Sequence, residues 1–137
     1  MKNPDFSWMV GRKVEVQFEA PLSWFFRLGD SLCISVECPW RVVANGTIAV
    51  SGDDHEQRFG LPEPIDSAQK ASSLLAGHVV RNVEVSSGTA DLRIFFDKEV
   101  QLEIIPFSSG YEGWQVSTPS GETVIAQGGG NLAVVRI

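Results

Sequence analysis

The chain has 137 residues, of which 43% are hydrophobic, and these numbers suit one domain with a substantial core, residues 1–137. Seventeen Asp and Glu residues against eleven Lys and Arg residues give a net charge of −6, and the positive residues form no stripe. We therefore expect no nucleic-acid partner, because Lys and Arg contacts to phosphate supply most of that affinity. The acidity either keeps the domain dissolved or presents an acidic face to a basic partner protein.

Membrane insertion and export are not expected either. No apolar run approaches the roughly 20 residues that span a bilayer, and the N-terminal residues MKNPDFSW lack the apolar core of a signal peptide. The sequence therefore predicts a cytoplasmic protein in which Cys33 and Cys38 stay reduced. Their odd spacing places them on opposite faces of a regular strand, which also disfavours a bond between them.

The first half of the chain predicts a series of short strands. Val14, Val16 and Phe18 alternate with polar residues, a period of two that indicates a strand with one buried face. Asn45-Gly46 lies between two apolar segments and predicts a hairpin turn, because both positions of a type I′ turn have positive φ. The strands expected from these patterns are residues 12–19, 22–28, 32–36, 40–44 and 47–50.

A connecting segment and one helix follow. Residues 51–63 show no period and are rich in turn-forming residues, so we expect a loop there. Residues 66–76 predict a short helix that lies on a sheet, because Asp66 can cap its first turn and Gly77 stands where a helix ends.

The second half centres on a hairpin around Asp97-Lys98-Glu99. Apolar residues occupy every second position on both sides, and a three-residue loop sets Ile94 opposite Leu102. The same register sets Arg93 across from Glu103 on the solvent face, a pair worth about 0.2–1 kcal/mol. Further strands are expected at residues 79–85, 114–118, 122–126 and 132–137, and the Gly-rich residues 127–131 are expected to bend and permit tight backbone packing.

The two halves resemble each other. A shift of 68 residues superimposes the alternating apolar positions of residues 24–36 on those of residues 92–104, and Trp40 matches Trp114 at a shift of 74. We therefore predict an α+β, mostly β fold of two pseudo-repeated antiparallel β-meanders, sandwich or barrel-like, with one short helix near residues 66–76. The halves span about residues 11–50 and 77–137, and the loop and helix at residues 51–76 link them.

Candidate catalytic and metal-binding residues are few. Asp53-Asp54-His55-Glu56 is the densest group of potential ligands, but its spacing matches no known metal site. A serine or cysteine hydrolase needs a base beside its nucleophile, and His55 and His78 are the two imidazoles. The sequence has no G-x-S-x-G motif, and residues 128–130 lack the Lys-Ser/Thr ending of a phosphate loop. We expect no catalytic residue, cofactor or metal, and an enzyme that uses one of the two histidines stays an alternative.

Tyr111-Glu112-Gly113-Trp114 is the most distinctive short motif. Trp114 shares strand parity with Val116, so it is expected in the core. Tyr111 and Glu112 precede that strand, and with Trp40 they form an expected recognition patch, since Tyr and Trp are favoured at protein interfaces.

Part of the chain resembles a known family. The matching residues are 94–96, 102–104, 111–114 and the Gly-Gly-Gly-Asn-Leu-Ala stretch at 128–133, and they resemble a family of small bacterial domains of unknown function. Members carry an F-x-D-G-x-x-L-like hairpin followed by Y-E-x-W, whereas this chain has Lys98-Glu99 where the family tends to have a turn glycine. Some members are found at polymorphic toxin–immunity loci. The resemblance therefore implies an immunity protein, and it implies no catalytic residues.

We accordingly expect a non-enzymatic binding protein, in particular an immunity protein that neutralises a bacterial toxin by occlusion. A basic protein is the expected partner, and a homodimer is a further option. The residues expected to bind the partner are Trp40, Asp53, Asp54, Glu56, Tyr111 and Glu112, with Trp8 and Trp24 as additional aromatic anchors. The alternatives are a small-ligand-binding β-domain, with a cavity between its halves, and a structural module that self-associates through the edge strand 132–137.

Overall fold

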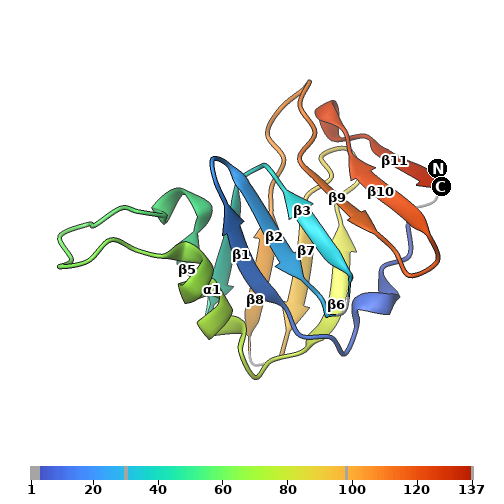
Figure 1. The fold of residues 1–137 in the computed structure, drawn as a ribbon. Coiled ribbons are helices and arrows are strands. Elements are labelled where there is room, and N and C mark those ends of the chain that lie inside the picture. Colours follow the sequence, from blue (N-terminus) through green and yellow to red (C-terminus); the bar gives the residue numbers. More distant parts are fainter. Residues whose placement is uncertain (1–3, 30, 98, 137) are drawn as a thin grey trace.

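The computed structural model describes residues 4–29, 31–97 and 99–136. These residues form two antiparallel β-sheets that face each other as a sandwich, with a single α-helix at the side (Figure 1). The strands are β1 Glu15–Glu19, β2 Ser23–Arg27, β3 Cys33–Val36, β4 Trp40–Ala44, β5 Thr47–Ser51, β6 Val80–Val85, β7 Leu92–Phe96, β8 Val100–Ile104, β9 Trp114–Ser117, β10 Glu122–Ala126 and β11 Leu132–Arg136. The predicted fold class is confirmed, and of the two predicted arrangements the chain adopts the two-sheet one.

The strand order shows how the two halves of the chain combine. One sheet has the order β1-β2-β3-β9-β10-β11, and the other has the order β5-β4-β8-β7-β6. Each half therefore places its first three strands in one sheet and its remaining strands in the other: β4 and β5 in the first half, and β9, β10 and β11 in the second. The halves join through two pairs, β3 with β9 in one sheet and β8 with β4 in the other. The halves were predicted as two separate meanders, whereas the structure exchanges strands between them. Under the predicted repeat, β1 to β5 correspond to β6 to β10, and β11 has no counterpart.

The β7–β8 hairpin has the predicted register. Ile94 pairs with Leu102, and both side chains are buried. The loop between the strands contains Lys98, which lies outside the described residues. The predicted ion pair does not form as expected: although Arg93 faces Glu103, the Glu103 carboxylate binds Arg41, whose Nε lies 2.6 Å from Oε1. Because β8 has neighbours on both sides, β4 brings Arg41 to the same carboxylate.

Other local predictions are confirmed with small shifts of boundary. Asn45 and Gly46 have φ of 54° and 82°, as the predicted hairpin turn requires. The first strand begins at Glu15 rather than at residue 12, because residues 11 and 12 instead exchange backbone hydrogen bonds with Val80 of β6. The last strand ends at Arg136, and Ile137 of the predicted strand lies outside the described residues. In the Gly-rich segment, the backbone of Gly128 packs directly against Gly110, leaving no room for a side chain.

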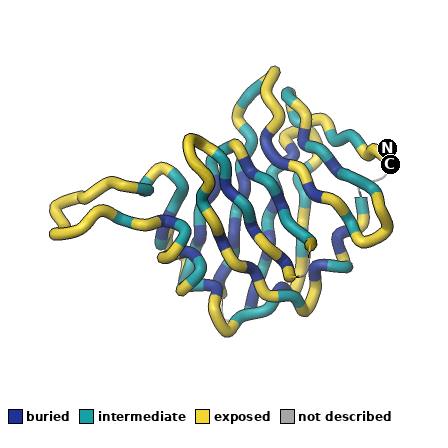
Figure 2. Tube along the Cα trace, viewed as in Figure 1, coloured by how far each residue is buried: buried dark blue, intermediate teal, exposed yellow. Residues whose placement is uncertain are grey.

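The core fills the space between the two sheets, and Figure 2 shows the buried positions alternating along the strands. Two tryptophans from equivalent places in the halves are almost completely buried, Trp40 at the start of β4 and Trp114 at the start of β9. Trp40 packs against Phe26 of the opposite sheet, with ring centroids 5.2 Å apart. Trp114 packs edge-on against Phe6, and its Nε1 donates a hydrogen bond to the Ala90 carbonyl at 2.9 Å.

The helix α1, Ser67–Leu75, closes one side of the sandwich. As predicted, Asp66 caps it, accepting a hydrogen bond from the Gln69 backbone at 3.1 Å. It packs against β1 and β5, which are edge strands of the two sheets. Ser72 Oγ accepts a hydrogen bond from Val16 N at 2.9 Å and donates one to Val16 O at 3.2 Å. The helix therefore satisfies backbone groups that an edge strand would otherwise leave unpaired.

Two loops project from the sandwich. The first, residues 56–65, extends past α1 in Figure 1 and is called the arm; backbone hydrogen bonds between Glu56 and Ile65 and between Ile65 and Gln57 close its base. The predicted loop at residues 51–63 thus begins with a short 3-10 turn at residues 52–54 and continues into the arm. The second loop, residues 105–113, joins β8 to β9. No helix in the described part of the chain has the length and apolarity needed to cross a bilayer.

Candidate functional site

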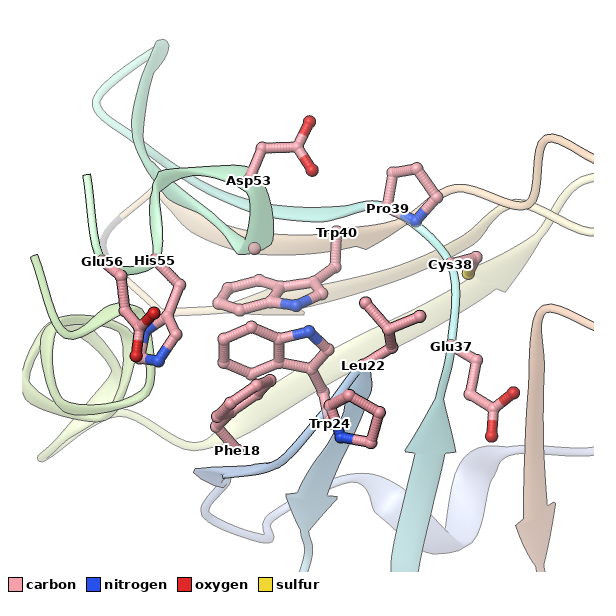
Figure 3. A pocket seen from close by; sticks show the side chains of 12 residues that line it. Phe18, Leu22, Trp24, Glu37, Cys38, Pro39, Trp40, Asp53, His55 and Glu56 are labelled. Carbon is pink, nitrogen blue, oxygen red and sulfur yellow. The ribbon is translucent and has the colours of Figure 1, made fainter.

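A hollow of about 370 Å³ lies at one end of the sandwich (Figure 3). We call it the end hollow. It is lined by the β1–β2 turn, by the crossing from β3 to β4, and by the turn that follows β5, together with the strand residues beside them. The lining residues are Phe18, Pro21, Leu22, Trp24, Glu37, Cys38, Pro39, Trp40, Gly52, Asp53, His55 and Glu56.

Aromatic rings form the floor of the end hollow. Trp24 and Trp40 come from opposite sheets and pack with centroids 4.9 Å apart. Phe18 lies 4.5 Å from Trp24, and the His55 ring lies 4.6 Å from Phe18. Since both tryptophans are buried by their neighbours, the rings are held in place before any ligand arrives.

Carboxylates surround this aromatic floor. Glu37, Asp53 and Glu56 are exposed residues that line the end hollow from two different connections. None of the three forms an ion pair with any residue that the structure describes. The lining contains no Lys or Arg. The end hollow is therefore apolar at its base and negatively charged at its rim.

The Trp40 indole has an unsatisfied hydrogen-bond donor. Its Nε1 is buried and has no partner among the described residues. Gly52 lies against this edge of the ring, where a Cβ on residue 52 would come within 2.7 Å of Nε1. Leaving such a donor without an acceptor costs about 1–3 kcal/mol. Figure 3 shows the nitrogen-bearing edge of the Trp40 ring on the side of Leu22.

His55 connects the end hollow to the helix. Its Nδ1 accepts a hydrogen bond at 3.1 Å from the backbone N–H of Ser67, the first residue of α1. Because Nδ1 is the acceptor, the neutral imidazole carries its proton on Nε2. The ring is thus fixed by a backbone hydrogen bond on one side and by Phe18 and Trp24 on the other.

A second, smaller hollow of about 160 Å³ adjoins the first. Glu37 lines both, and Glu112 lines the second together with Gly113 and Trp114. The β3–β4 crossing is tied to the 105–113 loop by a hydrogen bond from Glu37 N to Gly113 O at 2.9 Å. Tyr111 stands on this loop with 84% of its surface exposed.

The predicted binding residues therefore have different fates. Trp40, Asp53 and Glu56 meet in the end hollow, and Glu112 lies in the adjoining one. Trp40 and Trp24 are only 2% and 6% exposed and form the floor of the end hollow. Asp54 is a structural residue, since its carboxylate accepts a hydrogen bond from Ser51 N at 2.9 Å and closes the turn after β5.

Trp8, which was predicted as an additional anchor, lines a different hollow, next to Val134. Three residues of the end hollow were not predicted from the sequence: Phe18, Leu22 and Glu37. Leu22 and Glu37 could have been predicted, because each stands next to a proline-containing segment that ends a strand, Pro21 and Cys38-Pro39. Residues in such segments lie at the end of a sheet.

The cysteines show no sign of nucleophilic chemistry. Cys33 and Cys38 are not bonded to each other. Burial raises the pKa of the Cys38 thiol to about 12, so it is protonated at neutral pH. Within the described part of the chain, no three His, Cys, Asp or Glu side chains gather closely enough to hold a metal ion.

A comparison with protein families identifies nearly the whole chain. The model of a family described as "Family of unknown function (DUF6188)" matches residues 7–136. No match was found among curated proteins or among solved structures.

Proposed function

This chain belongs to a family of unknown function, DUF6188, and we propose that it is a non-enzymatic binding protein that receives a basic partner protein at the end hollow and its flanking loops. In its specific form, the proposal is that of an immunity protein which occludes a bacterial toxin, as the resemblance over roughly residues 75–135 implies. We also place the protein in the cytoplasm, which the unbonded cysteines support.

The observation that carries the proposal is the rim of carboxylates around an aromatic floor. Glu37 comes from the β3–β4 crossing, and Asp53 and Glu56 come from the connection after β5, yet all three line one hollow. Opposite charge on a partner would speed its approach and fix its orientation. Leu22, which lines the same hollow and is 75% exposed, offers the apolar contact that gives an interface much of its affinity.

The loops beside the end hollow provide the area that a protein partner needs. A stable interface uses about 20–30 residues on each side, and the end hollow alone has 12. Large apolar side chains stand exposed on the neighbouring connections: Leu22, Phe59 and Leu61, and on the 105–113 loop Phe107 and Tyr111. The arm and the 105–113 loop thus extend the surface on either side of the β3–β4 crossing.

Two alternatives have specific support. The volume of the end hollow, about 370 Å³, falls within the roughly 300–1,000 Å³ of small-molecule sites, which favours a small ligand. Val134 and Val135 on the edge strand β11 are each 47% exposed, which favours self-association through that strand. Native mass spectrometry separates these cases, because it would show a bound small mass in the first and a dimer in the second.

A binding measurement with charge variants tests the main proposal. The partner to test is the purified product of the adjacent gene. We expect Asp53→Lys with Glu56→Lys to weaken binding about tenfold or more and to slow association. The matched control is Glu15→Lys with Glu84→Lys, which changes the net charge equally at exposed strand positions away from the end hollow. Equal losses in both double variants, or no binding by the wild-type protein, would refute the proposal.

A further inference from the structure

We propose that the end hollow is a receptor for one lysine or arginine side chain, together with a backbone carbonyl of the segment that carries it. This inference rests on the proposed function and names the group that a basic partner inserts. Three features of the end hollow lead to it: its aromatic lining, the charge of its rim, and the unsatisfied Trp40 donor.

The floor suits a cation on an alkyl stem. The faces of aromatic rings carry partial negative charge and attract an ammonium or guanidinium group within about 6 Å, and tryptophan does so most strongly. Phe18, Trp24 and Trp40 lie in one chain of contacts, at 4.5 and 4.9 Å between centroids. Trp24 and Trp40 are only 6% and 2% exposed, so the half-buried Phe18 presents the accessible ring surface, and the two tryptophans lie directly behind it. The alkyl stem of a lysine or arginine side chain can pack on Leu22 and Pro39, which line the same hollow.

The rim suits the charged head of that side chain. Glu37, Asp53 and Glu56 form no ion pair with a described residue. Among the described residues, their one side-chain hydrogen-bond partner is Ser23, whose Oγ donates to Glu37 at 3.4 Å. A guanidinium or ammonium group at the mouth of the end hollow would therefore meet carboxylates that are not already neutralised.

The second half of the chain shows what satisfies the equivalent tryptophan. Trp114 corresponds to Trp40, and its Nε1 donates to the carbonyl of Ala90 at 2.9 Å. At the shift of 68 residues, the counterpart of Ala90 is Leu22. Ala90 is completely buried, whereas Leu22 is 75% exposed and only lines the hollow.

This comparison identifies the missing group. In one half a backbone carbonyl of the chain itself pairs with the indole N–H, and in the other half Trp40 Nε1 has no partner among the described residues. An incoming peptide can supply that carbonyl next to its cationic side chain. The end hollow therefore fits a basic peptide segment better than it fits a bare amine.

Titration by NMR with small probes tests this inference on the isolated protein. The probes are acetyl-Gly-Lys-Gly-amide and its arginine counterpart, and the neutral control is the same peptide with norleucine. We expect the lysine or the arginine peptide to shift the indole N–H signals of Trp24 and Trp40 saturably, and the norleucine peptide to leave them unchanged. Butylammonium, which has the cation without a carbonyl, should bind several times more weakly.

Matched variants complete the test. Asp53→Asn with Glu56→Gln should weaken the lysine or arginine peptide about tenfold, whereas Glu15→Gln with Glu84→Gln should have no effect. Equal binding of the norleucine peptide, or no indole shift with either basic peptide, would overturn the inference; equal binding of butylammonium would overturn the carbonyl's part in it. If the basic peptides do not bind while the adjacent gene product still depends on Asp53 and Glu56, the inference fails and the proposed function stands. If the basic peptides bind but the adjacent gene product does not, the proposed function is refuted.

Discussion

Replacing Gly52 with alanine tests how tightly the end hollow is built around Trp40. A Cβ on residue 52 would lie 2.7 Å from Trp40 Nε1 and 3.2 Å from two ring carbons. Ordinary contacts of this kind begin near 3.4 Å, so the ring and the backbone must separate by about 0.7 Å (3.4 − 2.7). Gly52 does not have a left-handed φ, so alanine adds crowding without adding backbone strain.

Neighbouring aromatic rings restrict how the crowded ring can move. Trp24 lies 4.9 Å from Trp40 on one side, and Phe26 lies 5.2 Å away. Adding atoms to a well-packed core typically costs about 1–3 kcal/mol. For a chain of 137 residues, unfolding entropy per residue converts this cost into a fall in Tm of about 3–10 °C.

Thermal and urea unfolding measure this cost. Gly110→Ala is the matched control, because a Cβ there meets nothing within 4 Å and its φ is not left-handed. We expect Gly110→Ala to stay within about 0.5 kcal/mol of the wild-type protein. If Gly52→Ala is equally stable, then Trp40 is not held as the structure shows, and the argument for a preformed floor fails.

Three further predictions concern titration and the edge of the sheet. A hydrogen bond from His78, at 2.7 Å, holds the pKa of Asp97 below its ordinary value of 3.8. The stability that this bond contributes is therefore present above pH 3.8 and is lost as the pH falls through the lowered pKa. In acid unfolding, Asp97→Asn should lack this loss of stability with falling pH. Burial raises the pKa of Cys38 to about 12 from an ordinary 9.0, so the stability contributed by the neutral thiol is present below pH 9 and falls between pH 9 and 12. In urea titrations over this pH range, the free energy of unfolding of Cys38→Ala should fall less than that of the wild-type protein. Ser72→Ala should destabilise the protein by about 1–3 kcal/mol in urea, because it leaves two backbone groups of β1 without their partner; the wild-type value would show that water replaces the hydroxyl.

Local patterns predicted local structure well. The register of β7 on β8 follows from alternation, because a slip by one residue would expose Ile94 and Leu102 together. The turn at Asn45 and the cap at Asp66 follow from side-chain and backbone preferences that act within a few residues. Each of these features depends on contacts between near neighbours in the sequence.

The pairing of strands from different halves was not predictable in the same way. Nothing in the residues of β3 specifies β9 rather than another apolar strand as its partner, since pairing depends on the whole set of strands. For the same reason, the contact between Trp24 and Trp40 across the two sheets could not be predicted from the sequence. Asp54 shows a different limit of the sequence, because its proximity to Asp53 and Glu56 did not reveal that its carboxylate bonds to the backbone of its own turn.

The difference between the two tryptophan sites suggests why only one of them is open. Each begins the first strand after the chain passes from one sheet to the other, Trp40 in β4 and Trp114 in β9, so the two rings occupy equivalent positions in the fold. At Trp114, Phe6 from the segment before the first repeat packs on the ring, and Ala90 pairs with its N–H. At Trp40, the corresponding turn residue Leu22 points to solvent instead, and the segments that surround it carry carboxylates. Phe6, from outside the two halves, and Ala90, from within the second, therefore close the Trp114 site, whereas no described residue pairs with the indole N–H at Trp40. The shared core positions hold both rings, and the connections around them decide which site can receive a ligand.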